Sequence, residues 1–345
     1  MSFFQVQVDR IAGIRVLSLT GGMIGSHSVD EVATLLARDA TLVWVDVPEC
    51  SDQAVTLLTD VLKCHPLAVR DCMQRNRVPR VRIYPHQQLL ILHGPERGPS
   101  SHVHYLALDQ IIGEKYVVTV PGPINPTVPI DVALRETDGV RKRIEAGRLR
   151  PDSPYELSYA ITSALTHRLK AFIEDLTRDV WDLERRVTGG HMGNPEEFLE
   201  ELFGAWHGLL AVRMMGALGA EVLGRVAALE ARIPVDERPL IADATDQMNR
   251  IRNLADGERE YGALLDLRHE HHRQRHHPRH PVGRGALDHG WRGPSAAAGG
   301  KGPHGGTGLT VVLAPGHHGP HAAEGHPSHR RSGGRSGALR QRLLS

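Results

Sequence analysis

The chain has 345 residues, enough for roughly two ordinary domains, and a formal net charge of +1. This balance conceals an asymmetry, because residues 269–345 hold 11 Lys and Arg, 3 Asp and Glu, 13 of the 22 His and 16 of the 36 Gly. Residues 1–268 therefore carry 30 basic and 37 acidic side chains, which argues against a nucleic-acid-binding surface. The three cysteines, Cys50, Cys64 and Cys72, lack metal-binding or redox spacing and predict free thiols in a reducing compartment.

Several function classes leave no signature in the sequence. We find no signal peptide and no run of about 18 apolar residues, so neither secretion nor a transmembrane helix is expected from the sequence as written. A phosphate-binding loop, a dinucleotide-binding glycine motif and a nucleophile elbow are also missing. None of these motifs therefore assigns a chemical reaction to the sequence.

Residues 1–122 predict an α/β (α+β) domain with a mixed sheet and flanking helices. Strands are expected in the short apolar or alternating segments Phe4–Val8, Ile14–Leu19, Leu42–Val47, Val81–Tyr84, Leu89–Leu92, His102–Leu108 and Tyr116–Val120. Helices are expected at residues 28–38, where Ser28 and Glu31 fit a capping box, at 51–63, and at 66–73 after Pro66.

Residues 123–268 predict a long helical stalk or funnel. A polar helix is expected at 131–147, followed by helices at 154–187, 195–229 and 237–267. Apolar residues of the helix at 154–187 recur at steps of three and four, as in a coiled coil. Helices of about 30 residues far exceed the globular mean of about 11–12 and favour a stalk over a compact enzyme domain.

Residues 269–345 lose this apolar period and are rich in His, Gly, Pro and Arg. Such a composition cannot bury a core, so a disordered tail is expected. Its imidazoles could instead bind a transition metal ion, although no regular spacing defines a closed site. Disorder driven by composition is the favoured interpretation.

Acidic residues on the long helices allow two interpretations. Asp243 and Asp246 are three residues apart and can share one helix face, where their oxygens would suit a hard divalent cation. An ordinary solvated helix face is the alternative.

A series of short motifs resembles the CorA magnesium transporter family in order, spacing and type of secondary structure. The motifs are Trp44–Asp46, His65–Leu67, Asp71, Val78–Arg80, Tyr84, Gly113–Val120, Trp181–Val187 and Asp243–Asp246, the last followed by Gln247 in place of a histidine. The resemblance runs from about residue 5 to residue 268, and the sequence is identified as a member of this family.

The resemblance implies a homopentamer at the cell membrane, with cytoplasmic α/β domains and a funnel of long helices. It implies passive transport of divalent cations such as Mg²⁺ or Co²⁺, which involves no covalent chemistry, so the resemblance also implies that the protein is not an enzyme. Mg²⁺ would also regulate the protein, bound between subunits by the residues that match Asp71 and Asp243. The acidic residue that precedes Asp71 in the family pattern is Arg70 here, which opposes cation binding. For Asp71, an ordinary position on a helix surface is the alternative.

The sequence departs from the family pattern where the pore should begin. Neither transmembrane helix nor the Gly-Met-Asn motif is found, and the pattern fails around residues 261–268. The composition of residues 269–345 is typical of a GC-rich coding sequence read in the wrong frame, which favours a frame-disrupted or truncated copy in the cytoplasm. Transport by the sequence as written is therefore expected to be defective or incomplete, because the pore is missing. The other interpretation is a soluble Mg²⁺-responsive or His-tail metal-binding protein. Without the selecting motif, the sequence does not decide among Mg²⁺, Co²⁺, Ni²⁺ and Zn²⁺.

Overall fold

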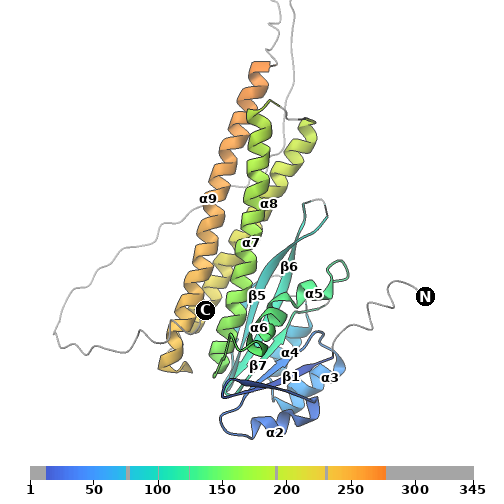
Figure 1. Cartoon of the computed structure of the whole chain (residues 1–345), viewed down its shortest axis with the longest axis vertical. Helices are drawn as coiled ribbons and strands as arrows, with labels where there is room; N and C mark the ends of the chain where they lie inside the picture. Colours follow the sequence, from blue (N-terminus) through green and yellow to red (C-terminus); the bar gives the residue numbers. More distant parts are fainter. Residues whose placement is uncertain are drawn as a thin grey trace, which may run out of the picture.

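The computed structural model describes residues 13–74, 78–99, 101–123, 125–190, 193–229 and 232–276, with side chains as far as Glu258. The strand predicted at Phe4–Val8 and the tail beyond His276 lie outside these residues, so both stay predictions. Within the described residues the chain forms a mixed sheet followed by long helices, as the sequence predicts (Figure 1).

The described part of the chain contains one seven-stranded sheet in the order β2-β1-β3-β7-β6-β5-β4. β3 and β7 run parallel, and the other neighbouring strands run antiparallel. The strands are β1 (Arg15–Thr20), β2 (Met23–His27), β3 (Leu42–Asp46), β4 (Arg80–Ile83), β5 (Gln87–Arg97), β6 (Val103–Gly113) and β7 (Tyr116–Val120).

Helices cover both faces of the sheet. Val43 and Val45 of β3 belong to the hydrophobic cluster of one face, which includes α2 (Val32–Leu36), α3 (Asp52–Thr56), the π-helical turn η2 (Leu57–Val61) and α4 (Pro66–Met73). Trp44 belongs to the cluster of the other face, which includes α6 (Arg135–Glu145) and α7 (Pro154–Thr188). Alternation of buried side chains along β3 thus makes the sheet the middle one of three layers.

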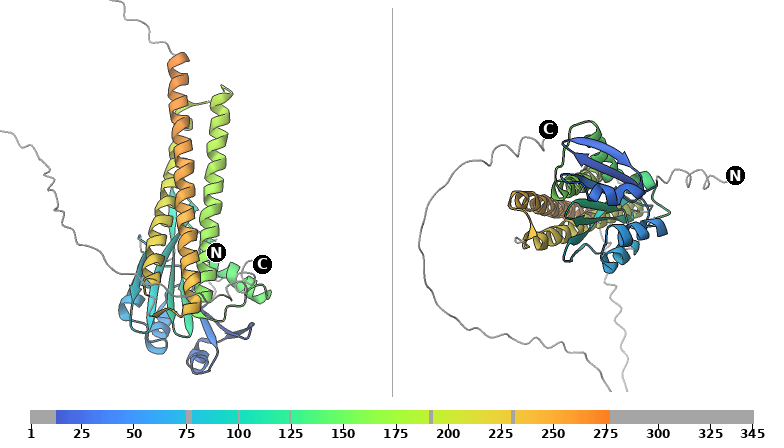
Figure 2. Two further views of the ribbon diagram at one scale, coloured as in Figure 1. Left: turned by 90° about the vertical axis from the view of Figure 1, so that its left-hand side faces the viewer. Right: turned by 90° about the horizontal axis from the view of Figure 1, so that it is seen from below.

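Long helices extend beyond the sheet (Figures 1 and 2). They are α7 with 35 residues, α8 (Pro195–Ala227) with 33 and α9 (Arg238–His276) with 39. The side chains of Ser153 and Asn194 cap the N-termini of α7 and α8. They accept hydrogen bonds from the backbone N–H groups of Glu156 and Glu196, respectively.

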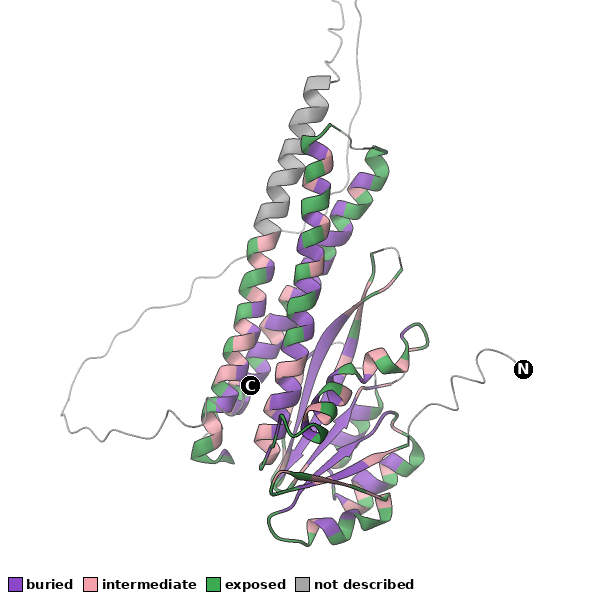
Figure 3. Ribbon diagram, in the orientation of Figure 1, coloured by how far each residue is buried: buried purple, intermediate pink, exposed green. Residues whose placement is uncertain are grey.

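One hydrophobic cluster continues from the sheet into these helices. It joins Leu92 of β5 to Leu165 of α7, Leu209 of α8 and Met248 of α9. Figure 3 shows the buried residues of the long helices along the sides that face one another. The boundary predicted between residues 122 and 123 therefore marks a change of secondary structure within a continuous core.

Several details differ from the sequence prediction. The short strand β2 was missed, and β5 and β6 are longer than predicted because they pair with each other over eleven residues each, including the polar ends of β5 and the polar Asp109 and Gln110 of β6. The helix predicted at 51–63 divides into α3 and η2, and the helix predicted at 131–147 divides into α5 (Ile130–Ala133) and α6.

The predicted end of the last helix is also wrong. α9 follows the short turn η4 (Val235–Glu237) and runs to His276, past the predicted end at residue 267 and the predicted tail boundary at 268/269. Residues 268–276 lack an apolar stripe but contain no Gly or Pro, and Pro278 is the first helix-breaking residue. The composition predicts little packing there, and it does not exclude a helix.

α8 and α9 come close at Gly216. A Cβ atom added there would lie 3.0 Å from both the carbonyl oxygen of Met248 and the backbone nitrogen of Arg252. These backbone atoms cannot swing aside as a side chain can. A Cβ added at Gly224, on the same helix, would meet nothing within 4 Å.

We expect Gly216→Ala to lower the free energy of unfolding by about 1–3 kcal/mol, because it overpacks the α8–α9 contact. The control Gly224→Ala should raise it by up to about 1 kcal/mol through better helix propensity. Urea unfolding of the full chain measures both changes. Equal stabilisation by the two substitutions would show that the helices do not touch at Gly216.

Candidate functional site

Asp71 lies in the last turn of α4, and its side chain is only 3% exposed. Three arginines surround its carboxylate. Arg82 Nε donates to Asp71 Oδ2, Arg80 Nη1 lies 4.0 Å from the same oxygen, and Arg70 Nη2 lies 3.8 Å from Oδ1. Asp71 is therefore not the helix-surface residue of the alternative interpretation.

Arg70 was predicted beside Asp71, whereas the contacts of Arg80 and Arg82 with this carboxylate were not. Both lie on β4, opposite Ile91 and Leu89 of β5, whose side chains pack on the α4 side of the sheet. Side chains two residues apart on a strand share a face. The Arg80-Val81-Arg82 alternation was thus the available signal that both arginines lie beside α4.

A Mg²⁺ ion, which the resemblance implies at Asp71, does not fit the surroundings of this carboxylate. Mg²⁺ needs oxygen ligands in near-octahedral geometry, whereas Arg70, Arg80 and Arg82 place positive charge there. A guanidinium and a divalent cation compete for the same oxygens and repel each other. Within the described ranges, no group of three or more His, Cys, Asp or Glu could hold a metal ion.

Asp243 lies on α9 against α7, with its side chain 47% exposed. Tyr159 Oη and Gln247 Nε2 each donate to Asp243 Oδ2 at 2.6 Å, and Thr166 Oγ1 donates to Gln247 Oε1 at 2.7 Å. Arg250 Nη2 lies 3.9 Å from Asp243 Oδ1. Burial raises the pKa of Tyr159, and its hydrogen bond to Asp243 adds to this shift, so Tyr159 stays a donor. Asp243 therefore links the two helices.

One chain does not bring Asp71 and Asp243 together. α4 packs on the face of the sheet that carries α2 and α3, whereas α9 belongs to the cluster of the opposite face. A joint site would need two subunits, as the resemblance implies, and that pairing stays a prediction. Asp246 is exposed on α9.

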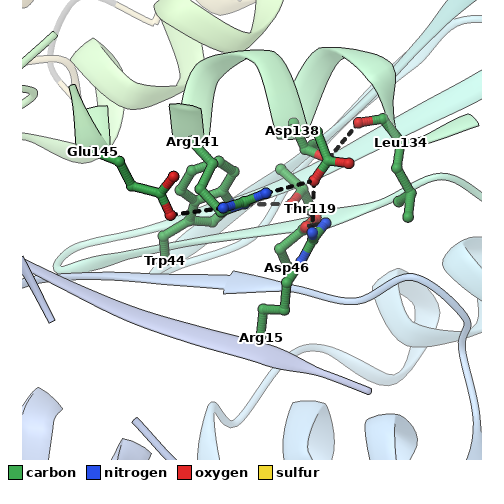
Figure 4. A network of polar contacts seen from close by, with 9 residues as sticks. Arg15, Trp44, Asp46, Thr119, Leu134, Asp138, Arg141 and Glu145 are labelled. Atoms are coloured by element: carbon green, nitrogen blue, oxygen red, sulfur yellow. Dashed lines mark hydrogen bonds and ion pairs between the residues drawn. The ribbon is translucent and has the colours of Figure 1, made fainter. Parts of the chain in front are cut away.

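The Trp44–Asp46 motif forms a polar network between the sheet and α6 (Figure 4). Trp44 Nε1 donates to Thr119 Oγ1 at 3.0 Å, and Thr119 Oγ1 donates to Asp46 Oδ1 at 2.5 Å. Arg15 pairs with Asp46 and donates from Nη1 to Asp138 Oδ1 at 2.6 Å. Burial raises the pKa of Asp46, and the charge of Arg15 opposes this shift. The network ties β1, β3 and β7 to α6, which is a structural role.

Arg168 of α7 is a buried cation between the sheet and the long helices. Its Nη1 donates to Glu136 Oε1 at 3.2 Å, to Glu136 Oε2 at 3.1 Å and to the Val132 carbonyl at 3.1 Å. Nη2 donates to Glu96 Oε2 at 2.7 Å, and Nε donates to the Pro95 carbonyl at 2.8 Å. Burial raises the pKa of Glu136, and Arg168 opposes this shift. No motif in the sequence predicted this ion group.

Asp109 of β6 is fully buried under α4. The Cys72 thiol and the charges of Asp71 and Arg80 act on its carboxylate, and among the described residues neither carboxylate oxygen has a conventional hydrogen-bond partner. Burial therefore raises the pKa of Asp109 well above its usual value. Cys50, Cys64 and Cys72 are free thiols, as predicted. Burial raises the pKa of Cys50 and of Cys64 to about 11, which makes them poor nucleophiles.

A family model described as "CorA-like Mg2+ transporter protein" matches residues 39–271. This range covers more than half of the chain and includes the motifs that carry the resemblance. The chain therefore belongs to the CorA family of transporter proteins, and its mixed sheet and long helices have the arrangement of that family.

Known proteins agree with this assignment. The chain is 24% identical over 230 residues to the putative metal ion transporter YfjQ of Bacillus subtilis (strain 168), a match that covers 64% of this chain and 66% of YfjQ, just under two thirds. Full-length CmaX has a TM-score of 0.63 at 15% identity, covering 76% of this chain and 78% of CmaX. The complete CorA magnesium transporter of Methanocaldococcus jannaschii has a TM-score of 0.61 at 13% identity, covering 77% and 79%. At such identities the two structures show the fold alone.

The helices that the structure describes include none with both the length and the apolar run needed to cross a bilayer.

The buried Asp109 predicts how stability changes with pH. Because its folded-state pKa is raised, the folded chain keeps this proton at pH values where the unfolded chain has lost it. Below the unfolded-state pKa of about 3.9, Asp109 is protonated in both states and makes its full contribution to the free energy of unfolding. Above that value, the free energy of unfolding falls by up to about 1.4 kcal/mol per pH unit.

We expect Asp109→Asn to gain stability relative to the wild type as the pH rises from 4 to 7. Urea unfolding of both full-length proteins across this range gives the difference directly. Asp39→Asn, which removes a fully exposed carboxylate, is the matched control. A difference between Asp109→Asn and wild type that stays constant with pH would mean that Asp109 ionises normally in the folded chain.

Proposed function

We propose that this chain serves in divalent metal ion transport of the CorA type at the cell membrane. The family match over residues 39–271 carries the proposal, and the similarity to a putative metal ion transporter supports metal ions as the cargo. Movement of an ion down its electrochemical gradient needs no covalent chemistry, so we propose no enzymatic activity.

The arrangement of the chain suits this proposal. The sheet lies toward one end of the described part, and the long helices extend away from it toward the other end (Figure 2). In a homopentamer of the family type, the sheets would face the cytoplasm and the long helices would lead toward the membrane. Mg²⁺ and Co²⁺ are the cargo ions that we propose.

We propose that Asp243 contributes to regulation by Mg²⁺ as one half of a site. The other half would come from a second subunit. Asp243 is half-exposed, and the hydrogen bonds from Tyr159 and Gln247 both go to Oδ2. Oδ1 faces one guanidinium, that of Arg250 at 3.9 Å, whereas the Asp71 carboxylate faces three. Asp71 is enclosed by arginines, so no gating step is assigned to it.

The alternative of a soluble protein that binds metal through its His-rich tail gains no support from the described residues. That tail beyond His276 lies outside them, as does most of the segment where the sequence predicts a frame disruption.

The proposal is tested by deleting the gene in its host and measuring metal uptake at limiting metal concentration. Initial uptake rates of Mg²⁺, Co²⁺, Ni²⁺ and Zn²⁺ are followed by mass spectrometry, with K⁺ as the control. We expect slower uptake of at least one divalent ion, restored by an intact gene copy, and unchanged K⁺. Equal uptake of all four divalent ions with and without the gene would refute the proposal.

A further inference from the structure

The three arginines around Asp71 form a compact group at one edge of the sheet. We call Arg70, Arg80 and Arg82 the arginine cluster. β4 is one of the two edge strands of the sheet, and α4 lies beside it, so the cluster borders solvent. The side chains of Arg70, Arg80 and Arg82 are 55%, 38% and 34% exposed, whereas that of Asp71 is 3% exposed.

Positive charge exceeds negative charge in this group. In the described part of the chain, the ion pairs of all three arginines go to Asp71. One carboxylate therefore faces three guanidinium groups. Each guanidinium carries five N–H donors, so the cluster has many more donors than the two oxygens of Asp71 can accept.

Asp71 also fixes the position of the cluster. Arg82 donates to it through Nε. Arg70 and Arg80 approach Asp71 at 3.8 and 4.0 Å, beyond hydrogen-bond distance. Two exposed guanidinium groups thus keep their donors for another partner, while the buried carboxylate holds the third in place.

We propose that the arginine cluster binds a phosphate-class oxyanion and does not bind a divalent cation. The forked donors of arginine match the oxygens of phosphate in pairs, and the excess positive charge favours an anion. The same charge repels Mg²⁺. This inference rests on the proposed function, since it replaces the ligand that the resemblance implies at Asp71.

The test measures the melting temperature of the full chain with sodium pyrophosphate, inorganic phosphate or MgCl₂, each compared with NaCl of equal ionic strength. A ligand that binds the folded state raises the melting temperature in a saturable manner. We expect pyrophosphate to do so more strongly than phosphate. MgCl₂ should add nothing to the effect of NaCl.

The double variant Arg70→Gln/Arg80→Gln leaves the Arg82–Asp71 pair intact and should keep the fold. It should weaken pyrophosphate binding by about tenfold or more, as expected for the loss of a charge-assisted hydrogen bond. The matched control Arg178→Gln/Arg225→Gln removes two arginines that are 69% and 66% exposed on α7 and α8. It should bind pyrophosphate as the wild type does.

Three results would overturn the inference. Equal pyrophosphate binding by both double variants would show that the cluster is not the site. A saturable Mg²⁺ effect that Asp71→Asn removes would establish a cation site instead. Sedimentation in which pyrophosphate dissociates an oligomer would identify carboxylates of a second copy as the occupant of the cluster. None of these results bears on the metal-uptake test, so failure here is distinct from failure of the proposed transport function.

Discussion

The buried ion group of Arg168 is the interaction on which the arrangement of sheet and long helices depends. A guanidinium in an apolar core is costly unless charge and hydrogen bonds compensate it. Arg168 meets this need with two carboxylates and two backbone carbonyls, which come from β5, the segment before α6, and α6 itself. Arg168 lies on α7, the first long helix. The charge of Arg168 is compensated only when α7 lies in one position against the sheet.

The other polar networks depend on this alignment. Two ion pairs hold α6 in place. Arg15 of β1 contacts Asp138, and Arg168 of α7 contacts Glu136. α9 then packs against α7 through the Asp243, Tyr159 and Gln247 hydrogen bonds. Motion of the long helices would therefore be transmitted to the sheet through these contacts.

Local patterns let the sequence predict much of the fold. Ser153 and Asn194 mark the starts of α7 and α8 because capping depends on a few neighbouring residues. The ends of β5 and β6 were not predictable in this way, since the polar residues there are held by cross-strand pairing within the β5–β6 hairpin and not by a local apolar pattern. Residues 268–276 show the converse limit, because a helix can continue without any apolar stripe to reveal it.

The same limit applies to the candidate site: local motifs identify residues, but contacts between elements decide their chemistry. The motif order led to Asp71 and Asp243, but the partners that decide their chemistry come from other elements. Arg82 reaches Asp71 from β4, and Tyr159 reaches Asp243 from α7. Since charge around a carboxylate decides whether it attracts a cation, family membership does not fix the ligand at Asp71.

A double-mutant cycle on Arg168 and Glu136 tests the central role of the buried ion group most directly. Urea unfolding of the full chain gives the free energies for Arg168→Met, Glu136→Leu and the double variant. Arg168→Met should cost about 3–5 kcal/mol, because it leaves the buried Glu136 carboxylate without its counter-charge. Glu136→Leu should cost less, since Arg168 keeps its ion pair with Glu96. The double variant should cost much less than the sum of the two single changes. Additive effects, or single losses no larger than the roughly 0–1 kcal/mol of a surface ion pair, would contradict the account.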